Sequence, residues 1–310
     1  MNKYDINKDI KYLEDNGVVF DTWIEVSDEF YHGSPGISAS GLKTIDKTCP
    51  KVYHYGKGVK TEKSEALILG SAIHKYILEN DDFDSEYLIS PSDKKTDREY
   101  KSHVLAHKDE IAAGSTVLRK RDGDMLKGIL ESLKESFTKG GTNTYDGIII
   151  NPNTKREMAL YTIDKDRNII LKVKVDVNMS GMFLDLKSTK SADPEVFMKD
   201  AANLGYGIQA AYYLKIAQLA NQEAKMFGFI AVEKTAPFIH SVILLSDEDI
   251  QLELSKVNRL LDEYAFCLNH DIWYGPNGID KVTKREPLFV VSRMPSWHRF
   301  KLEEENNFEG

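Results

Sequence analysis

The segment from Asn168 to Thr189 constrains the fold of this chain more strongly than any other stretch. Its sequence, NIILKVKVDVNMSGMFLDLKST, contains two runs rich in β-branched and aliphatic residues, separated by the turn-forming letters NMSG. Alternation in the first run is expected to place Leu171, Val173, Val175 and Val177 on one face and Lys172, Lys174 and Asp176 on the other. The segment therefore predicts two consecutive strands of a β-sheet.

Two acids and one lysine on these strands indicate a chemistry. Asp176 lies on the first strand, and Asp185 and Lys187 lie on the second. A connecting loop with an even number of residues places all three side chains on one face, whereas an odd loop separates the two acids across the sheet. Taken alone, an Asp-x-Lys triplet also fits an ordinary exposed hairpin with an Asp–Lys ion pair.

Two carboxylates on a shared face need a counter-ion. At ~4 Å and an effective dielectric of ~20, their repulsion is on the order of 4 kcal/mol. A divalent cation such as Mg²⁺ converts that repulsion into binding, polarises a phosphoryl oxygen and activates a bound water. Lys187 can orient this water or stabilise the developing negative charge. Asp176, Asp185 and Lys187 together therefore fit phosphodiester hydrolysis.

The remaining patterns predict an α/β core with helical additions. Helices are expected at four places: after Ser38 or Ser40, from Ser64, over about residues 194–220, and from Ser246 to a point before Gly275. Further short strands are expected at GIIINP, EMALYTID, MFGFIAVE and FIHSVILL. We expect one domain over residues 37–310, preceded by an N-terminal arm or extension over residues 1–36.

Composition excludes several classes of protein. No apolar run approaches the ~18 residues of a membrane span, and the polar N-terminus does not read as a signal peptide. The only cysteines, Cys49 and Cys267, favour a reducing cytoplasm and cannot form a four-cysteine metal site, so any metal should be a hard cation held by oxygen ligands. The net charge of -8 does not itself favour nucleic acid, although positive charge can be confined to one groove.

Two further features carry polar side chains where aliphatic ones would be ordinary. Gly205, Gln209 and Tyr213 are spaced by four residues and would form one ridge of a helix, either as a polar contact stripe or as plain helix packing with a surface Gln. His74 lies at the border of the apolar stripe of the helix that begins at Ser64. It is either a structural histidine or, as a neutral imidazole, a metal ligand.

Taken together, these pieces resemble the exonuclease VIII (RecE-like) branch of the PD-(D/E)XK nucleases, which is related to the RecB nuclease domain and more distantly to lambda exonuclease. The resemblance runs from about Ile37 to Phe300. It is carried by the order and spacing of the segments ISASGLK, LILGSAIHKYILE, KVDV with LDLKST, GYGIQAAYY, IAVEK and DIWYG. It implies a PD-(D/E)XK restriction-endonuclease-like core, in which helices flank a central mixed β-sheet.

The resemblance also implies roles for individual residues. The metal ligands would be His74, Asp176, Asp185 and the backbone carbonyl of Leu186; Lys187 would be the catalytic lysine, and Gln209 and Tyr213 would line the active site. Glu157 would either bind the metal or support a group that does, and Glu79 reads as structural. Lys174 departs from the pattern, because many relatives have Arg there.

The implied activity is that of an Mg²⁺-dependent exodeoxyribonuclease, with Mn²⁺ able to substitute. It would degrade one strand of linear double-stranded DNA, 5′ to 3′, and leave a 3′ tail for a RecT-like single-strand annealing protein. The implied assembly is a ring-like homo-oligomer, encoded by a phage or prophage and acting in the bacterial cytoplasm. The alternatives are an endonuclease or repair nuclease of the same fold, or a non-catalytic DNA-binding module.

Overall fold

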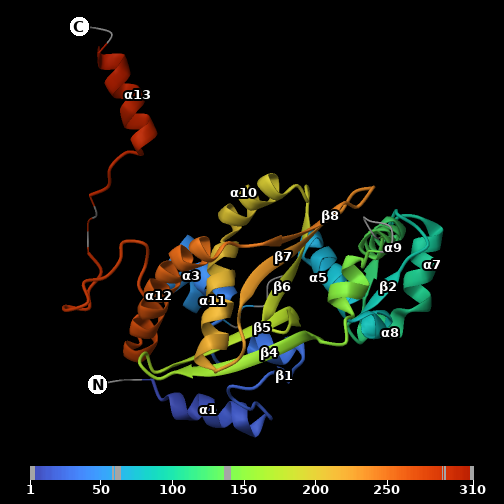
Figure 1. Ribbon diagram of the computed structural model, residues 1–310, viewed down its shortest axis with the longest axis horizontal. Coiled ribbons are helices and arrows are strands. Elements are labelled where there is room, and N and C mark those ends of the chain that lie inside the picture. Colours follow the sequence, from blue (N-terminus) through green and yellow to red (C-terminus); the bar gives the residue numbers. More distant parts are fainter. Residues whose placement is uncertain are drawn as a thin grey trace.

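A six-stranded mixed β-sheet forms the centre of the computed structural model, which describes residues 4–57, 59, 64–135, 141–287, 289 and 291–307 (Figure 1). In spatial order the strands are β1 (Ile24–Glu25), β4 (Thr154–Asp164), β5 (Ile169–Met179), β6 (Met182–Thr189), β7 (Met226–Glu233) and β8 (His240–Leu244). β6 and β7 run parallel, and the other neighbours are antiparallel. The expected α/β fold class is confirmed.

The turn between β5 and β6 decides on which side the acidic residues lie. Ser180 and Gly181 form a two-residue turn, and both have positive φ, 52° and 86°. Such a turn matches the twist of the strands that it joins. The loop is therefore even, as one alternative required. Pairing of Val177 with Leu184 places Asp176 opposite Asp185 at the next position of the register.

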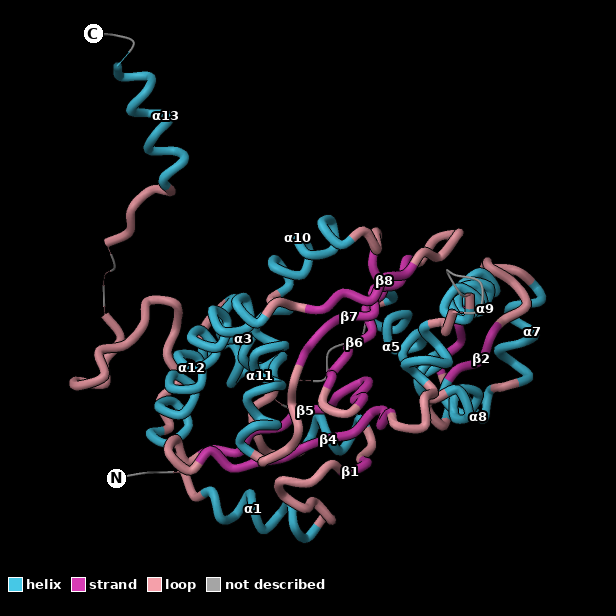
Figure 2. The backbone as a smooth tube through the Cα atoms, viewed as in Figure 1, coloured by secondary structure: helices cyan, strands magenta, loops and turns pink. Residues whose placement is uncertain are grey.

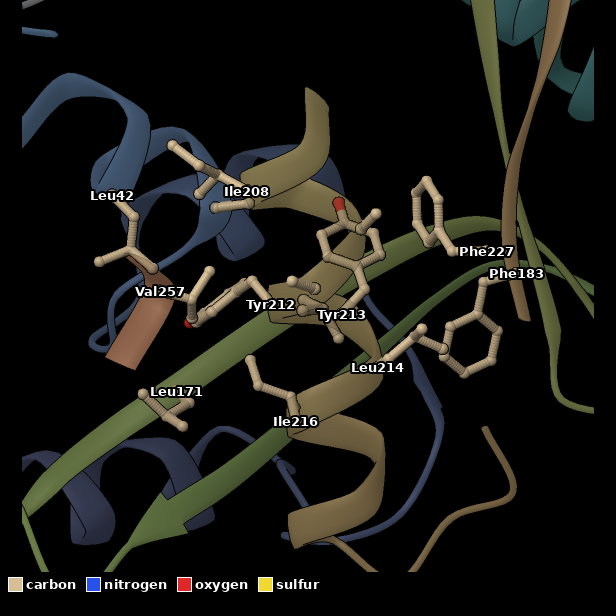
Figure 3. Packing of buried hydrophobic residues seen from close by; sticks show 14 of the residues in the cluster. Leu42, Leu171, Phe183, Ile208, Tyr212, Tyr213, Leu214, Ile216, Phe227 and Val257 are labelled. Carbon is tan, nitrogen blue, oxygen red and sulfur yellow. The ribbon is translucent and has the colours of Figure 1, made fainter. Parts of the chain in front are cut away.

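Helices cover both faces of this sheet (Figures 1 and 2). One face packs against α3 (Ala39–Lys47), α10 (Pro194–Leu204), α11 (Tyr206–Leu219) and α12 (Asp247–His270). α11 is buried around most of its circumference because it lies between the sheet and α3 and α12, where its buried residues interlock with theirs (Figure 3). The opposite face packs against α5 (Glu65–Leu78) and α9 (Lys120–Lys134).

Serine caps define where several of these helices begin. The side chains of Ser38, Ser64 and Ser246 accept backbone N–H groups at the starts of α3, α5 and α12. All three positions agree with the sequence prediction. The other elements are α1 (Ile6–Asp15), α2 (Asp28–Gly33), α4 (Pro50–Gly56), η1 (Asn80–Asp82), α6 (Phe83–Glu86), β2 (Tyr87–Ile89), α7 (Arg98–Ala106), α8 (Lys108–Ala112), β3 (Thr116–Leu118), η2 (Tyr145–Ile149) and α13 (Ser296–Asn307).

The helix predicted over residues 194–220 is two helices, so that prediction is wrong in one respect. Gly205 ends α10 with φ 68°, a left-handed conformation that glycine adopts without steric cost. α11 then starts in a new direction. Gln209 and Tyr213 share a face of α11 as expected, but Gly205 is the hinge before that helix and not part of its ridge.

Two details of the strand predictions are also wrong. GIIINP does not form a strand; residues Tyr145–Ile149 make a helical turn, which buries Tyr145 and Ile149 four residues apart against the α9 side of the sheet. Val177 does not share a side with Val175. Val175 packs in the α11 core and Val177 in the α5 and α9 core, so the alternation of β5 changes phase between them.

Candidate active site

A cleft of about 890 Å³ opens beside the point where β5 and β6 diverge. The pairs of these two strands run from the turn to Val177 and Leu184. At the next position the Asp176 carboxylate accepts the backbone N–H of Leu186, at 2.8 Å, so that a side chain bridges the strands. α2, α3, α5 and the start of α11 supply the remaining walls. The cleft therefore lies at a natural opening of the sheet.

Three acids occupy one row across three neighbouring strands at this opening. The pairs Arg156↔Val177 and Met158↔Val175 place Glu157 of β4 opposite Asp176 of β5, and Asp185 of β6 follows on the other side. Glu157 has φ 51°, unusual for a residue with a side chain and often found where a functional site imposes strain. The row concentrates negative charge in a buried place.

His74 completes a group of side chains that can hold a metal ion. Its Nδ1 lies 3.3 Å from Oδ2 of Asp176. Ligand atoms of His74, Glu157 and Asp176 all lie within 4.8 Å of one another. α5 presents His74 here because its buried residues Ile73 and Ile77 fix that helix against the sheet. These three residues, from three elements, form one group.

Asp185 and Lys187 form a second, adjacent corner of the cleft. Asp185 is 3% exposed; its Oδ1 accepts from Gln209 Nε2 at 2.5 Å, and its Oδ2 meets the Lys187 ammonium. The same ammonium lies over the ring of Tyr206, 5.1 Å from its centre. Among the described residues, Asp185 is not part of the group of three. Its role as a metal ligand, like that of the Leu186 carbonyl, stays a prediction.

Comparison with known protein families decides the family. Residues 38–281 match the model of a family described as a PDDEXK-like domain of unknown function, DUF3799. The chain belongs to this family. The superfamily in the predicted resemblance is therefore confirmed, whereas the RecE-like branch within it stays a prediction.

Comparison with solved structures agrees with the fold of a PDDEXK-like domain. The crystal structure of a proposed exonuclease from Eubacterium rectale matches with a TM-score of 0.51 and 15% identity, over 89% of this chain and 98% of that one. The protein SSO0001 matches with a TM-score of only 0.29 and 15% identity, over 82% and 84%. None of the curated proteins matches the chain. Within the described segments, no helix is both long and apolar enough to span a membrane.

The electrostatics of this PDDEXK-like site favour the binding of a cation. Burial, with the charge of Asp185, raises the pKa of Asp176 well above its usual range. Burial, with the charge of Asp176, raises the pKa of Glu157 to about 7, although Lys174 acts in the opposite sense. Burial and the nearby Lys187 lower the pKa of His74, so its imidazole is neutral. Crowded carboxylates and a neutral imidazole are donors that fit a hard divalent ion such as Mg²⁺ or Mn²⁺.

Lys187 stays charged in this setting. Burial works against its charge, but the carboxylates of Asp185 and Asp176 outweigh burial and raise its pKa. Tyr213, predicted to line the site, does so from α11; its hydroxyl donates to the backbone carbonyl of Lys174 at 3.0 Å. It therefore also supports β5 two residues before Asp176.

Several residues of the site were not assigned a role from the sequence. Lys43 of α3 donates to Oε1 of Gln209 at 3.4 Å, and burial with the nearby charge of Lys187 lowers its pKa to about 8. Lys174 lies between two carboxylates, 2.5 Å from Asp28 and 2.9 Å from Glu157. The motif ISASGLK pointed to the helix that carries Lys43 but gave no role for the lysine. No sequence signal indicated Asp28.

Proposed function

We propose that this domain is a divalent-metal-dependent nuclease that hydrolyses phosphodiester bonds of DNA. The observation that carries the proposal is the row of Glu157, Asp176 and Asp185, with His74 and Lys187 beside it in one cleft. A buried row of acids is costly unless a cation compensates it. A charged lysine that opens on the same cleft supplies the second requirement, which is stabilisation of a phosphate during hydrolysis.

The two groups of residues in the cleft would have different roles. His74, Glu157 and Asp176 would hold the metal ion, and the ion would supply a Lewis acid and a coordinated water of lowered pKa. Lys187 faces the same space and donates to a phosphate oxygen as negative charge develops there. Gln209 donates to Asp185 and thereby fixes the carboxylate against which Lys187 is held.

Action from DNA ends is the finer part of the proposal. It is supported by the description of the Eubacterium rectale protein as a proposed exonuclease, which we extend to this chain through the shared fold. The RecE-like resemblance also implies the 5′ to 3′ direction, the 3′ tail, the annealing partner and the ring-like homo-oligomer. These four remain predictions.

Digestion of a linear duplex labelled at either the 5′ or the 3′ ends tests the proposal. We expect release of label from one end only, in Mg²⁺ or Mn²⁺, and no release when a chelator is present. Absence of hydrolysis with either ion would refute the nuclease. Equal rates on the linear duplex and on a covalently closed circle would instead identify an endonuclease.

A further inference from the structure

The N-terminal segment builds one wall of the cleft, although it lies outside the residues that match the family. Val26, Ser27, Asp28 and Glu29 line the cleft together with His74 and Asp176. The family match begins only at residue 38. A segment that precedes the family match therefore contributes to the cleft.

Two lysines of β5 fix that wall close to the acidic row. The Lys172 ammonium donates to the backbone carbonyls of Tyr31 and Ser34, at 2.5 and 2.6 Å. Lys174 holds Asp28 at 2.5 Å. Lys172 is only 4% exposed and lies four positions before Asp176 on the same strand. The wall is thus anchored to the strand that carries the central acid.

Beyond this wall the cleft continues into a second cavity of about 660 Å³. Val26, Ser27, Glu79, Glu157 and Lys174 line both spaces, so the two adjoin each other. The second cavity is rich in acids. Among the described residues, Glu25, Glu79, Asp81 and Asp82 line it, together with Glu157 at the junction, and Arg156 is its one further cation besides Lys174.

The side of the cleft formed by α3 and α11 has the opposite character. Its polar groups are hydroxyls, an amide and lysines: Ser38, Ser40, Lys43, Tyr206, Gln209 and the nearby Lys187. On the acidic side, each lysine is already shared by two carboxylates. Lys75 pairs with Glu79 and Glu86, and Lys174 pairs with Asp28 and Glu157. A phosphate chain is attracted to the first side and repelled from the second.

We infer that Glu25, Asp81 and Asp82 make the second cavity a stop for the phosphate backbone, so that cleavage needs a strand end that carries a hydroxyl. The inference rests on the proposed function and adds a substrate class to it. A strand enters along α3 and α11 and places a phosphodiester at the row of acids. Only an end without a phosphate can occupy the acid-lined space beyond Glu157. Each hydrolysis leaves the scissile phosphate on one product, and repeated cleavage requires that this phosphate depart with the released nucleotide, so that the remaining strand again ends in a hydroxyl. An uninterrupted strand would have to carry further phosphates into that space.

The test uses the triple variant Glu25→Gln, Asp81→Asn, Asp82→Asn. All three side chains are exposed, and none is assigned to metal binding or catalysis. Wild-type and variant proteins are compared on linear DNA with hydroxyl ends, on the same DNA with phosphate at both ends, and on covalently closed circles, single-stranded and duplex. A matched triple variant, Asp166→Asn, Glu195→Gln, Glu248→Gln, removes three exposed acids that line neither cavity.

We expect the wild-type protein to degrade hydroxyl ends about tenfold faster than phosphorylated ends and to leave circles intact. The triple variant should lose the preference for hydroxyl ends and cut circles that the wild-type protein leaves intact, because each neutralised acid lowers the repulsion of phosphates. The matched variant should behave like the wild type. Wild-type cleavage of circles at the linear rate, or an unchanged end preference in the triple variant, would overturn the inference and leave the nuclease intact. Inactivity of the wild type on every substrate would overturn both.

Discussion

Lys172, which is buried, and Lys187, which is half-buried, lie on neighbouring strands, and their surroundings differ in kind. Lys172 donates to two backbone carbonyls and to the hydroxyl of Ser34, and so it anchors the N-terminal segment. Lys187 meets the carboxylate of Asp185 and lies in the open cleft. Burial alone therefore does not mark a functional lysine. The partners of the ammonium decide whether the residue supports the fold or faces a ligand.

The largest expected effect separates these two lysines directly. Lys187→Ala should reduce hydrolysis about a thousandfold or more (~4 kcal/mol), because the variant loses the charge that stabilises the phosphate in the transition state. Single-turnover cleavage of a linear duplex in Mg²⁺ measures this effect. Thermal unfolding shows whether the variant still folds once the buried Asp185 has lost its ion-pair partner.

The matched control for that variant is Lys190→Ala, which removes an exposed lysine just after the end of β6. It should retain wild-type rates. Comparable loss of activity in both variants would mean that general positive charge, not the position of Lys187, supports hydrolysis.

Asp176→Asn tests the acidic residues that lie beside Lys187. It should weaken Mn²⁺ or Mg²⁺ binding about a hundredfold (~2.7 kcal/mol), since one of the three ligand groups loses its charge. The metal-free variant should be at least as stable as the wild type, because the repulsion with Asp185 and Glu157 is relieved. Calorimetric titration and thermal unfolding measure the two quantities, with Asp166→Asn in an exposed turn as control. Unchanged affinity would remove Asp176 from the ligand group.

The sequence predicted the parts of this site that depend on local patterns. The strand alternation and the turn-forming NMSG gave β5, β6 and the two acids, and the even loop then set Asp176 opposite Asp185. Serine caps gave the starts of α3, α5 and α12. Each of these features is encoded by residues close together in the chain.

The features that escaped prediction depend on contacts between distant residues. The resemblance implied a choice of two roles for Glu157, but its position opposite Asp176 is set by the register in which β4 pairs with β5. The phase change of β5 between Val175 and Val177 was not predicted. Asp28 reaches the cleft because Lys172 and Lys174 hold the N-terminal segment against β5. No local pattern specifies a contact between residues that are more than a hundred positions apart.

Lys172→Met tests whether Lys172 supports the fold rather than the reaction. It should destabilise the fold by about 2 kcal/mol, because the buried carbonyls of Tyr31 and Ser34 lose their hydrogen-bond donor. Urea unfolding measures the free energy of unfolding, and Lys165→Met in the exposed turn before β5 is the control. Metal affinity should fall far less than in Asp176→Asn. A loss of hydrolysis as large as that of Lys187→Ala, without loss of stability, would contradict the division between the two lysines.

The smallest effect concerns Lys43, a third lysine whose surroundings lie between those of the other two. It meets a neutral amide oxygen, as Lys172 meets carbonyls, but it faces the cleft, as Lys187 does. Lys43→Ala should raise KM for DNA about tenfold (~1.4 kcal/mol) with little change in kcat, because its charge attracts phosphate without stabilising the transition state. Lys47→Ala, one turn later on α3 and exposed, should leave KM unchanged.

The effect of Lys43→Ala should depend on pH, and the pKa of Lys43 sets the direction of that dependence. Burial and Lys187 lower the pKa of Lys43 to about 8, so its ammonium is present below that pH and lost above it. The advantage of the wild type over Lys43→Ala in kcat/KM should therefore be full at pH 7 and fade towards pH 9. An advantage that stays constant over this range would mean that Lys43 contributes packing rather than charge. Lys43 would then support the fold, as Lys172 does. Of these three lysines, Lys187 alone would contact the phosphate.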